Sequence, residues 1–242
     1  MAGLAVGIIS SGRKTDIRWS LTLPMLSING PVGMNIGWIV AVSDKNNPKP
    51  VGVDRADNRT KVVEKAISAG FEYLCFIDDD TCCPNFALKY LHFQLANNLN
   101  AMICGGIYCT KEDMPSPLVF KEIGGGPFWQ WKIGDVFECQ GLGLGCTMIK
   151  TEVFKSISQP WFFEPHETPI DQTIRVGTED MSLGHREGTD DLYFCKKVTD
   201  AGFKILAHGG VLPVHLDQDG KMYTLPMDSY PVQGSNLKAL EQ

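Results

Sequence analysis

The stretch Glu72-Tyr-Leu-Cys-Phe-Ile-Asp-Asp-Asp80 is the part of the chain that decides its expected fold. Residues 73–77 form a continuous apolar run of strand length, which is typical of a strand buried on both faces of a sheet. Three aspartates, Asp78, Asp79 and Asp80, follow this run directly. Open parallel sheets bind their ligands outside the carboxyl ends of the strands. We therefore expect a ligand site where this strand ends.

The segments around this strand alternate between two hydrophobic patterns. Continuous apolar runs predict strands, and apolar residues spaced three or four apart predict helices. In chain order the segments are strand 4–10, strand 35–42, helix 57–70, strand 73–77, helix 84–97 and strand 101–108. This alternation predicts an α/β fold, with a mostly parallel sheet flanked by helices.

The second half of the chain has a less regular pattern. In order, it predicts antiparallel strands 117–123 and 130–138 around the turn Gly124-Gly-Gly126, strand 145–149, helix 152–157, helix 188–201 and strand 203–208. Residues 160–188 are polar and interrupted by Pro and Gly, which is typical of a long functional loop. We therefore expect a smaller antiparallel region beside the main sheet.

Composition narrows the class of protein. The 242 residues carry a net charge of −6 and have a pI near 5.4, which argues against a general nucleic-acid binder. No stretch approaches the roughly 20 apolar residues that cross a membrane. The apolar run near the N-terminus has no basic residue before it, unlike a secretion signal. The expectation is a cytoplasmic protein without a transmembrane segment.

The three adjacent carboxylates predict a bound cation, because they repel one another when ionised. Oxygen ligands of this kind suit Mg²⁺ or Mn²⁺, which bridge protein carboxylates to substrate phosphates. In an extended backbone Asp78 and Asp80 point the same way, whereas Asp79 points the opposite way. The alternative is a solvated acidic turn.

Several motifs in order resemble those of GT-A glycosyltransferases, in particular the large family-two-like group. The strand ending in Asp78-Asp-Asp80 resembles the Asp-x-Asp motif of that group. Upstream, Arg55-Ala-Asp-Asn-Arg-Thr60 resembles its Arg-bearing helix start, and residues 141–154 resemble its acceptor-side strand and helix. Pro160-Trp-Phe162 follows at the usual place.

Two later motifs complete the resemblance. Residues 188–202 are similar to the family's x-Glu-Asp helix start, although Asp190 stands where glutamate is common. Val211-Leu-Pro-Val-His215 resembles the late histidine segment that often completes the metal site. The similarity implies a GT-A (Rossmann-like) domain at 1–217, with a nucleotide-binding half at 1–110 and an acceptor-binding half at 111–217. Residues 218–242 would form a C-terminal tail.

The resemblance implies a metal-dependent glycosyltransferase. It would move a sugar from a nucleoside-diphosphate sugar, UDP-linked by analogy, to a hydroxyl of an acceptor that the sequence does not identify as a glycan, a protein or a small molecule. It implies Asp80 and His215 as ligands of the metal, with Asp78 sharing the metal or touching the ribose. One imidazole among oxygen ligands favours Mn²⁺ over Mg²⁺. His208 is a nearby competitor, and His166 and His185 are weaker ones.

The remaining contacts with the nucleoside-diphosphate sugar are expected from residues near the first and third predicted strands. Arg59, at a helix start, is expected to pair with the diphosphate. Ser10 would contact the base or ribose, and Asp79 is included among the donor-binding residues. A basic cluster follows the first strand and could also attract the diphosphate; its members are Arg13, Lys14 and Arg18.

Asp191, with Asp190 beside it, is the candidate catalytic pair on the acceptor side. An inverting enzyme needs a carboxylate to take the acceptor proton, and Asp191 precedes an amphipathic helix. A helix N-terminus also favours ionised acids. Thr178-Glu-Asp180 is a second match to the same motif. Simple helix capping by Thr189 with two acids is the structural alternative.

Two further features bear on the substrate. Gly141, Gly143 and Gly145 alternate along a predicted strand and are expected to let a substrate approach the backbone. Trp161 is the favoured platform for a sugar ring among four aromatic candidates, the others being Trp129, Trp131 and Phe162.

Two other functions fit parts of the pattern. A sugar-1-phosphate nucleotidyltransferase shares an α/β architecture and a metal–diphosphate site, and Ser10-Ser-Gly-Arg-Lys14 faintly echoes its Gly-rich loop. A non-catalytic sugar-nucleotide binding module is the other alternative. The acids at both Asp78–Asp80 and Asp190–Asp191 argue against it, because a binder needs no base.

Overall fold

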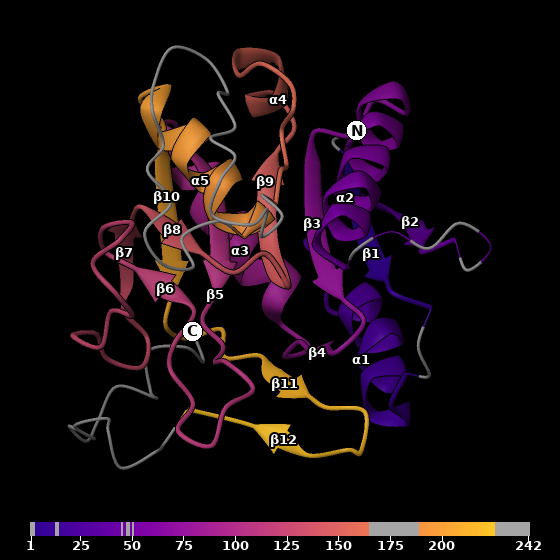
Figure 1. The fold of residues 1–242 in the computed structure, drawn as a ribbon. Helices are drawn as coiled ribbons and strands as arrows, with labels where there is room; N and C mark the ends of the chain where they lie inside the picture. The colour runs from indigo at the N-terminus through magenta and orange to yellow at the C-terminus, as the bar shows by residue number, and fades with distance from the viewer. Residues whose placement is uncertain are drawn as a thin grey trace, which may run out of the picture.

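The structure of the chain is a computed structural model that describes residues 3–12, 15–44, 46, 49, 51–164 and 189–225. Its centre is a seven-stranded sheet in the order β2-β1-β3-β9-β5-β10-β7 (Figure 1). The strands are β1 (Gly3–Ser10), β2 (Asn35–Val42), β3 (Tyr73–Asp78), β5 (Ala101–Gly106), β7 (Val136–Cys139), β9 (Cys146–Lys150) and β10 (Lys204–His208). Strands β1, β2, β3, β5 and β10 run in one direction, and β9 and β7 run in the other. The predicted α/β class with a mostly parallel sheet is confirmed.

Helices cover both faces of this sheet. Helices α2 (Val51–Ser68) and α5 (Asp190–Asp200) pack with one hydrophobic cluster, and α1 (Ile17–Ile28) and α3 (Ala87–Asn97) pack with the other. The short α4 (Val153–Ser156) joins the α2 and α5 side. In Figure 1, α2 and α5 lie in front of the sheet and α3 lies behind it.

The central strands supply side chains to both clusters in alternation. In β3, Leu74 and Phe76 face the α2 and α5 side, whereas Cys75 and Ile77 face the α1 and α3 side. All four side chains are fully buried. Two covered faces explain why the sequence of this strand is continuously apolar rather than alternating.

The antiparallel region differs from the predicted hairpin. Strand β6 (Val119–Phe120) pairs with β8 (Gly141–Leu142), and β7 pairs with β10 in the main sheet. The prediction of paired strands around Gly124 was therefore wrong. The glycines do form turns, since Gly124 and Gly126 have positive φ, but the partners of both strands come from distant segments.

A third sheet lies at the edge where the central strands end. It contains β4 (Thr81–Cys82), β11 (Val214–Leu216) and β12 (Met222–Tyr223), all antiparallel. Strand β12 falls within the predicted C-terminal tail. This part of residues 218–242 therefore belongs to the folded sheet, because it supplies the second neighbour of β11.

Two helices differ from the sequence-based expectation. Helix α1 was not predicted, because Pro24 lies inside it and its exposed side includes apolar residues such as Leu21. Helix α2 begins at Val51 rather than near Asp57, and it ends before Gly70, which has a positive φ as expected of a helix-ending glycine. Within the described residues, no helix is both long and apolar enough to cross a membrane.

Candidate functional site

A cleft of ≈ 590 Å³ opens at the carboxyl edge of the sheet. Its acidic floor comes from the end of β3, and its other side comes from the start of α5 and the β6–β8 region. The residues that line it are Arg55, Arg59, Asp78, Asp80, Tyr108, Lys111, Leu118, Phe120, Gly124, Gly126, Leu142, Gly143, Thr189, Asp191, Leu192 and His215. Asp78, Asp80, Asp191 and His215 were proposed from sequence as site residues, and the fold brings them to one cavity.

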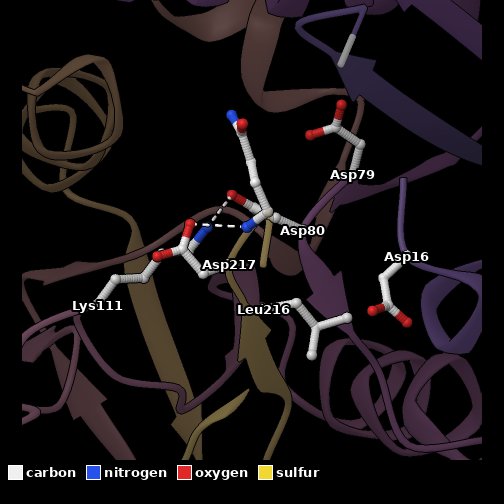
Figure 2. A pocket seen from close by; sticks show the side chains of 7 residues that line it. Asp16, Asp79, Asp80, Lys111, Leu216 and Asp217 are labelled. Carbon is white, nitrogen blue, oxygen red and sulfur yellow. Dashed lines mark hydrogen bonds and ion pairs between the residues drawn. The ribbon is translucent and has the colours of Figure 1, made fainter. Parts of the chain in front are cut away.

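Asp80 stands between two positively charged or chargeable side chains. Its Oδ2 lies 2.6 Å from Nζ of Lys111, and its Oδ1 lies 3.4 Å from Nε2 of His215. Burial works to raise the pKa of Asp80, but the contacts with His215 and Lys111 hold that pKa below its ordinary value. Figure 2 shows the Asp80 carboxylate facing the Lys111 ammonium, with Asp79 apart from this pair.

The small third sheet places His215 beside Asp80. His215 pairs with Thr81 across β11 and β4, and the Leu216 amide donates to the Asp80 carbonyl oxygen at 2.7 Å. The Nδ1 atom of His215 lies 2.8 Å from the Cys109 carbonyl oxygen. A carbonyl oxygen only accepts, so Nδ1 carries the proton, and in the neutral ring the lone pair is on Nε2, which faces Asp80.

Asp78 lines the same cleft as Asp80 and is held by Arg59 and Trp19. Its Oδ2 accepts from Nη2 of Arg59 at 3.1 Å, and its carbonyl oxygen accepts from Nε1 of Trp19 at 2.8 Å. Burial raises the pKa of Asp78, against the opposing pull of Arg59. Its Oδ1 is buried with no hydrogen-bond partner among the described residues. A buried carboxylate oxygen without a partner is an exception in folded proteins, and a bound water or ion is one physical explanation of it.

Arg59 is fully buried and is surrounded by carboxylates. Its Nε donates to Asp190 at 2.8 Å, and its Nη2 lies 3.1 Å from Asp78 and 3.2 Å from Asp191. Burial alone would lower the pKa of Arg59, but Asp78, Asp191 and Asp190 raise it well above its ordinary value. The guanidinium therefore links α2, β3 and α5. Its predicted contact with a diphosphate stays a prediction.

Asp190 lies in this buried network rather than in the cleft lining. Its side chain is fully buried, and Arg55 donates to its Oδ1 at 2.6 Å while Arg59 donates to its Oδ2. Arg55 also pairs with Glu164 at 2.6 Å. Both oxygens of Asp190 are thus committed to arginines, as in a structural ion pair.

Asp191, by contrast, lines the cleft and keeps an exposed fraction of 19%. Thr189 caps α5 by accepting from the Leu192 amide, and the Leu144 amide donates to Oδ2 of Asp191 at 3.3 Å. Burial, and after it the neighbouring Asp190, raises the pKa of Asp191 to about 7, against the pull of Arg59. This carboxyl group is poised to change its protonation near neutral pH.

Ser10 and Asp79 lie together at the end of β1. The Asp79 amide donates to the Ile9 carbonyl oxygen at 3.3 Å, and its Oδ2 accepts from the Ser11 amide at 3.2 Å. The Ser10 hydroxyl accepts from the Gly12 amide at 3.0 Å. Neither Ser10 nor Asp79 lines the large cleft, although Asp79 lines a smaller adjoining pocket that also contains Asp16 and Lys111 (Figure 2).

The other histidine candidates are not near this acidic run or fall outside the described residues. His208, at the end of β10, is buried, stacks on Tyr90 and accepts from the Gly210 amide, and it does not line the cleft. His166 and His185 lie outside the described residues. So do the second motif match at 178–180 and the basic residues Arg13 and Lys14.

The structure corrects the readings of the glycines and of Trp161. A Cβ on Gly143 would lie 2.4 Å from Oη of Tyr108, and one on Gly145 would lie 2.8 Å from it. Tyr108 therefore occupies the space that was assigned to a substrate, and its Oη accepts from the Gly145 amide. Trp161 is buried against Phe154 in the core, so it offers no sugar platform.

Three contributors to the site were missed from sequence. Lys111 comes from an irregular segment, Phe120 comes from a predicted strand but was not singled out, and Trp19 comes from the unpredicted helix α1. Lys111 and Phe120 line the cleft, and Trp19 holds the backbone of Asp78. No local pattern in the sequence marks these positions, because their role depends on contacts with distant segments.

The donor set fits a divalent cation that is shared with a substrate. In the described part of the chain, no three His, Cys, Asp or Glu side chains gather into a complete metal cage. Mg²⁺ and Mn²⁺ at nucleotide sites use only one or two protein ligands, and phosphate oxygens and water supply the rest. Oδ1 of Asp80 and Nε2 of His215 lie 3.4 Å apart, so an oxygen and a nitrogen donor of the kinds that bind divalent cations are side by side.

The comparisons with known proteins bear on the fold. No family model and no curated protein matches the sequence. Among solved structures, the crystal structure of A197 from STIV has a similar fold, with a TM-score of 0.57 and 17% sequence identity. The similarity covers 98% of this chain and 100% of that chain. At this level of identity it supports the α/β architecture alone.

Proposed function

We propose that this chain is a metal-dependent glycosyltransferase that moves a sugar from a nucleoside-diphosphate sugar to an acceptor hydroxyl. The observation that carries the proposal is that one cleft contains both candidate metal ligands and a candidate general base. Asp80 and His215 line it as ligands suited to a metal–diphosphate, and Asp191 lines it as a carboxylate that titrates near neutral pH. An inverting, metal-dependent sugar transfer needs both at once.

Asp80 and His215 are the residues that would hold the metal, and Asp78 lines the same cleft. The Cys109 carbonyl fixes the ring of His215 so that Nε2 is presented, which is the usual way in which a second group orients a metal-binding histidine. When bound, a divalent cation offsets the negative charge that develops on the leaving diphosphate. Mn²⁺ is preferred because the set includes an imidazole.

Asp191 is proposed as the general base of an inverting transfer. The base must take the proton of the acceptor hydroxyl as that oxygen attacks the sugar, and a base is most effective when its pKa is near the working pH. The raised pKa of Asp191 meets this condition, and its partial exposure leaves it accessible. Asp190 and Arg59 act as positioning residues, since they pair with each other and hold the start of α5.

The apolar wall of the cleft suits an acceptor or sugar ring. It is formed by Leu118, Phe120, Leu142 and Leu192. Phe120 takes the place of Trp161 as the aromatic candidate for stacking on a ring. Ser10 and Asp79, at the end of β1 beside this cleft, remain the proposed contacts for the nucleoside, and UDP is the proposed nucleotide.

A thermal-shift panel tests the donor side. The chain is heated with UDP, GDP, CDP, ADP and their common sugars, each with Mn²⁺, with Mg²⁺ and with chelator. Stabilisation by at least one nucleoside diphosphate that requires the metal is expected, because ligand binding to the native state raises its stability. Asp80→Asn should abolish the metal-dependent part, whereas Asp113→Asn, on the neighbouring exposed loop, should retain it.

Product analysis separates the proposal from its alternatives. A glycosyltransferase releases a nucleoside diphosphate from the stabilising donor, and a nucleotidyltransferase exchanges pyrophosphate. Formation of pyrophosphate from a nucleoside triphosphate and a sugar 1-phosphate would replace the proposal with the second class. Donor binding without turnover across a broad acceptor set would favour a binding module. Absence of any metal-dependent stabilisation would contradict the donor site itself.

A further inference from the structure

Lys111 pairs with the same carboxylate that would hold the proposed cation, through the oxygen that does not face His215. Its Nζ lies 2.6 Å from Oδ2 of Asp80, and the two side chains are equally exposed, at 22%. Lys111 lines both the large cleft and the smaller pocket of Figure 2. An ammonium and a divalent cation on the same carboxylate compete, because each offsets the same negative charge.

The backbone of Lys111 is held close to the proposed metal ligands. Two residues before Lys111, the Cys109 carbonyl oxygen accepts from Nδ1 of His215. This hydrogen bond fixes the backbone that leads to Lys111 next to the imidazole ring. Thr110 and Ser116 then close the loop, through Thr110 N to Ser116 O at 2.9 Å and Ser116 N to Thr110 Oγ1 at 3.0 Å. The side chain of Lys111 is therefore tethered at its base, while its flexible four-carbon stem leaves the ammonium able to move.

The other cations in the cleft lining are already committed. Arg59 is fully buried among Asp78, Asp190 and Asp191, and Arg55 joins Asp190 to Glu164. Moving either arginine would leave a buried carboxylate unpaired, which is strongly unfavourable. Moving Lys111 costs little once another cation sits at Asp80. Among the described cations of the cleft, Lys111 is thus the one suited to change partners.

We infer that Lys111 exchanges its partner during donor binding. In the free protein it neutralises Asp80, and when a divalent cation binds at Asp80 and His215 the ammonium moves to the diphosphate of the donor. The inference rests on the proposed function and assigns a phosphate-binding cation that the sequence did not reveal. It explains why a cleft proposed to take an anionic donor is lined by a carboxylate already paired with a lysine.

The test is the affinity of two ligands for Lys111→Met. Mn²⁺ binding alone is followed by electron paramagnetic resonance, and UDP binding at saturating Mn²⁺ is followed by calorimetry. Loss of the competing ammonium should tighten Mn²⁺ binding roughly threefold or more. Loss of a charge-assisted contact with phosphate should weaken UDP binding roughly tenfold or more. The two affinities are expected to move in opposite directions.

Two further variants guard the interpretation. Lys204→Met removes the same charge from an exposed pair with Glu138, away from the cleft lining, and should change neither affinity. Lys111→Arg keeps the charge and can grip Asp80 with two donors, so Mn²⁺ alone should bind no tighter than in the natural chain. Lys111→Arg also provides a measurement at this position if Lys111→Met does not fold.

Unchanged or weaker Mn²⁺ binding in Lys111→Met would overturn the exchange, and so would unchanged UDP binding. Both failures require that the natural chain binds Mn²⁺ and UDP, so the proposed function would survive them. If the natural chain binds neither ligand, the exchange and the proposed function fail together. The two kinds of failure are therefore distinguishable in one set of titrations.

Discussion

At the scale of single residues, the site separates two adjacent carboxylates by their surroundings. Asp190 has both oxygens bound by arginines and is fully buried, whereas Asp191 borders the cleft and has its pKa raised to about 7. Proteins give neighbouring carboxylates different roles by placing them in surroundings that move their pKa values apart. The two positions differ by one residue in sequence, and only the docking of α5 against α2 makes them different.

Asp191→Asn is expected to lower kcat/KM by about 10²- to 10⁴-fold, the usual contribution of a general base. In the natural chain the base form of Asp191 is populated as the pH rises through about 7, so the rate should rise between pH 6 and 8. That rise should disappear in the variant. The measurement is kcat/KM against pH, with donor affinity determined separately.

Asp200→Asn is the control, because it removes an exposed acid at the other end of the same helix. It should leave the rate and its pH profile unchanged. Normal turnover in Asp191→Asn with normal donor affinity would show that another group is the base. In that case the acid at Asp180, which lies outside the described residues, is the next candidate.

At the scale of elements, Arg59 connects a helix, a strand and a second helix. It lies in α2 and binds Asp78 at the end of β3 and Asp190 at the start of α5. Its guanidinium also stacks over the Phe76 ring at 5.0 Å. Removing one partner from a buried ion network leaves the others as uncompensated charges.

Arg59→Met is therefore expected to lower the free energy of unfolding by about 3–5 kcal/mol. Lys65→Met removes the same charge from the exposed side of α2 and should change it by less than about 0.5 kcal/mol. Urea denaturation at fixed pH measures both. A loss for Arg59→Met as small as that of the control would mean that the network does not link the two helices to β3.

At the scale of the whole molecule, burying Asp191 in a cleft has a cost that depends on pH. Its pKa is about 7 in the folded chain and near the ordinary value of 3.8 when unfolded. Between these two values the folded state binds the proton and the unfolded state does not. The contribution of this group to the free energy of unfolding therefore falls as the pH rises from about 4 to 7 and is constant above 7.

Comparing the natural chain with Asp191→Asn isolates this contribution, because the other groups titrate in both. The stability of the natural chain relative to the variant should fall across this window and level off above it. Urea denaturation at half-unit pH steps provides the measurement. A difference that is flat between pH 4 and 7, or that grows, would show that the pKa of Asp191 is not raised.

The secondary structure that the sequence predicted best was the buried centre. Residues 4–10 and 73–77 are central strands, because a sheet covered on both faces requires continuous apolar runs. Residues 35–42 also form the predicted strand, but β2 lies at the edge of the sheet and is largely exposed. Helix α1 could not be predicted, since Pro24 and an exposed apolar side obscure its pattern. The partners of β6 and β7 could not be predicted either, because strand pairing between distant segments leaves no mark in either segment.

The sequence by itself determined the α/β class and the positions of the candidate acids, since local hydrophobic period and strand ends are properties of short segments. Only the tertiary structure decided what surrounds each acid. It set Asp80 between Lys111 and His215, enclosed Arg59 among three carboxylates, and left Asp191 at the cleft. The physical reason is that burial, charge pairing and pKa depend on atoms contributed by segments far apart in the chain.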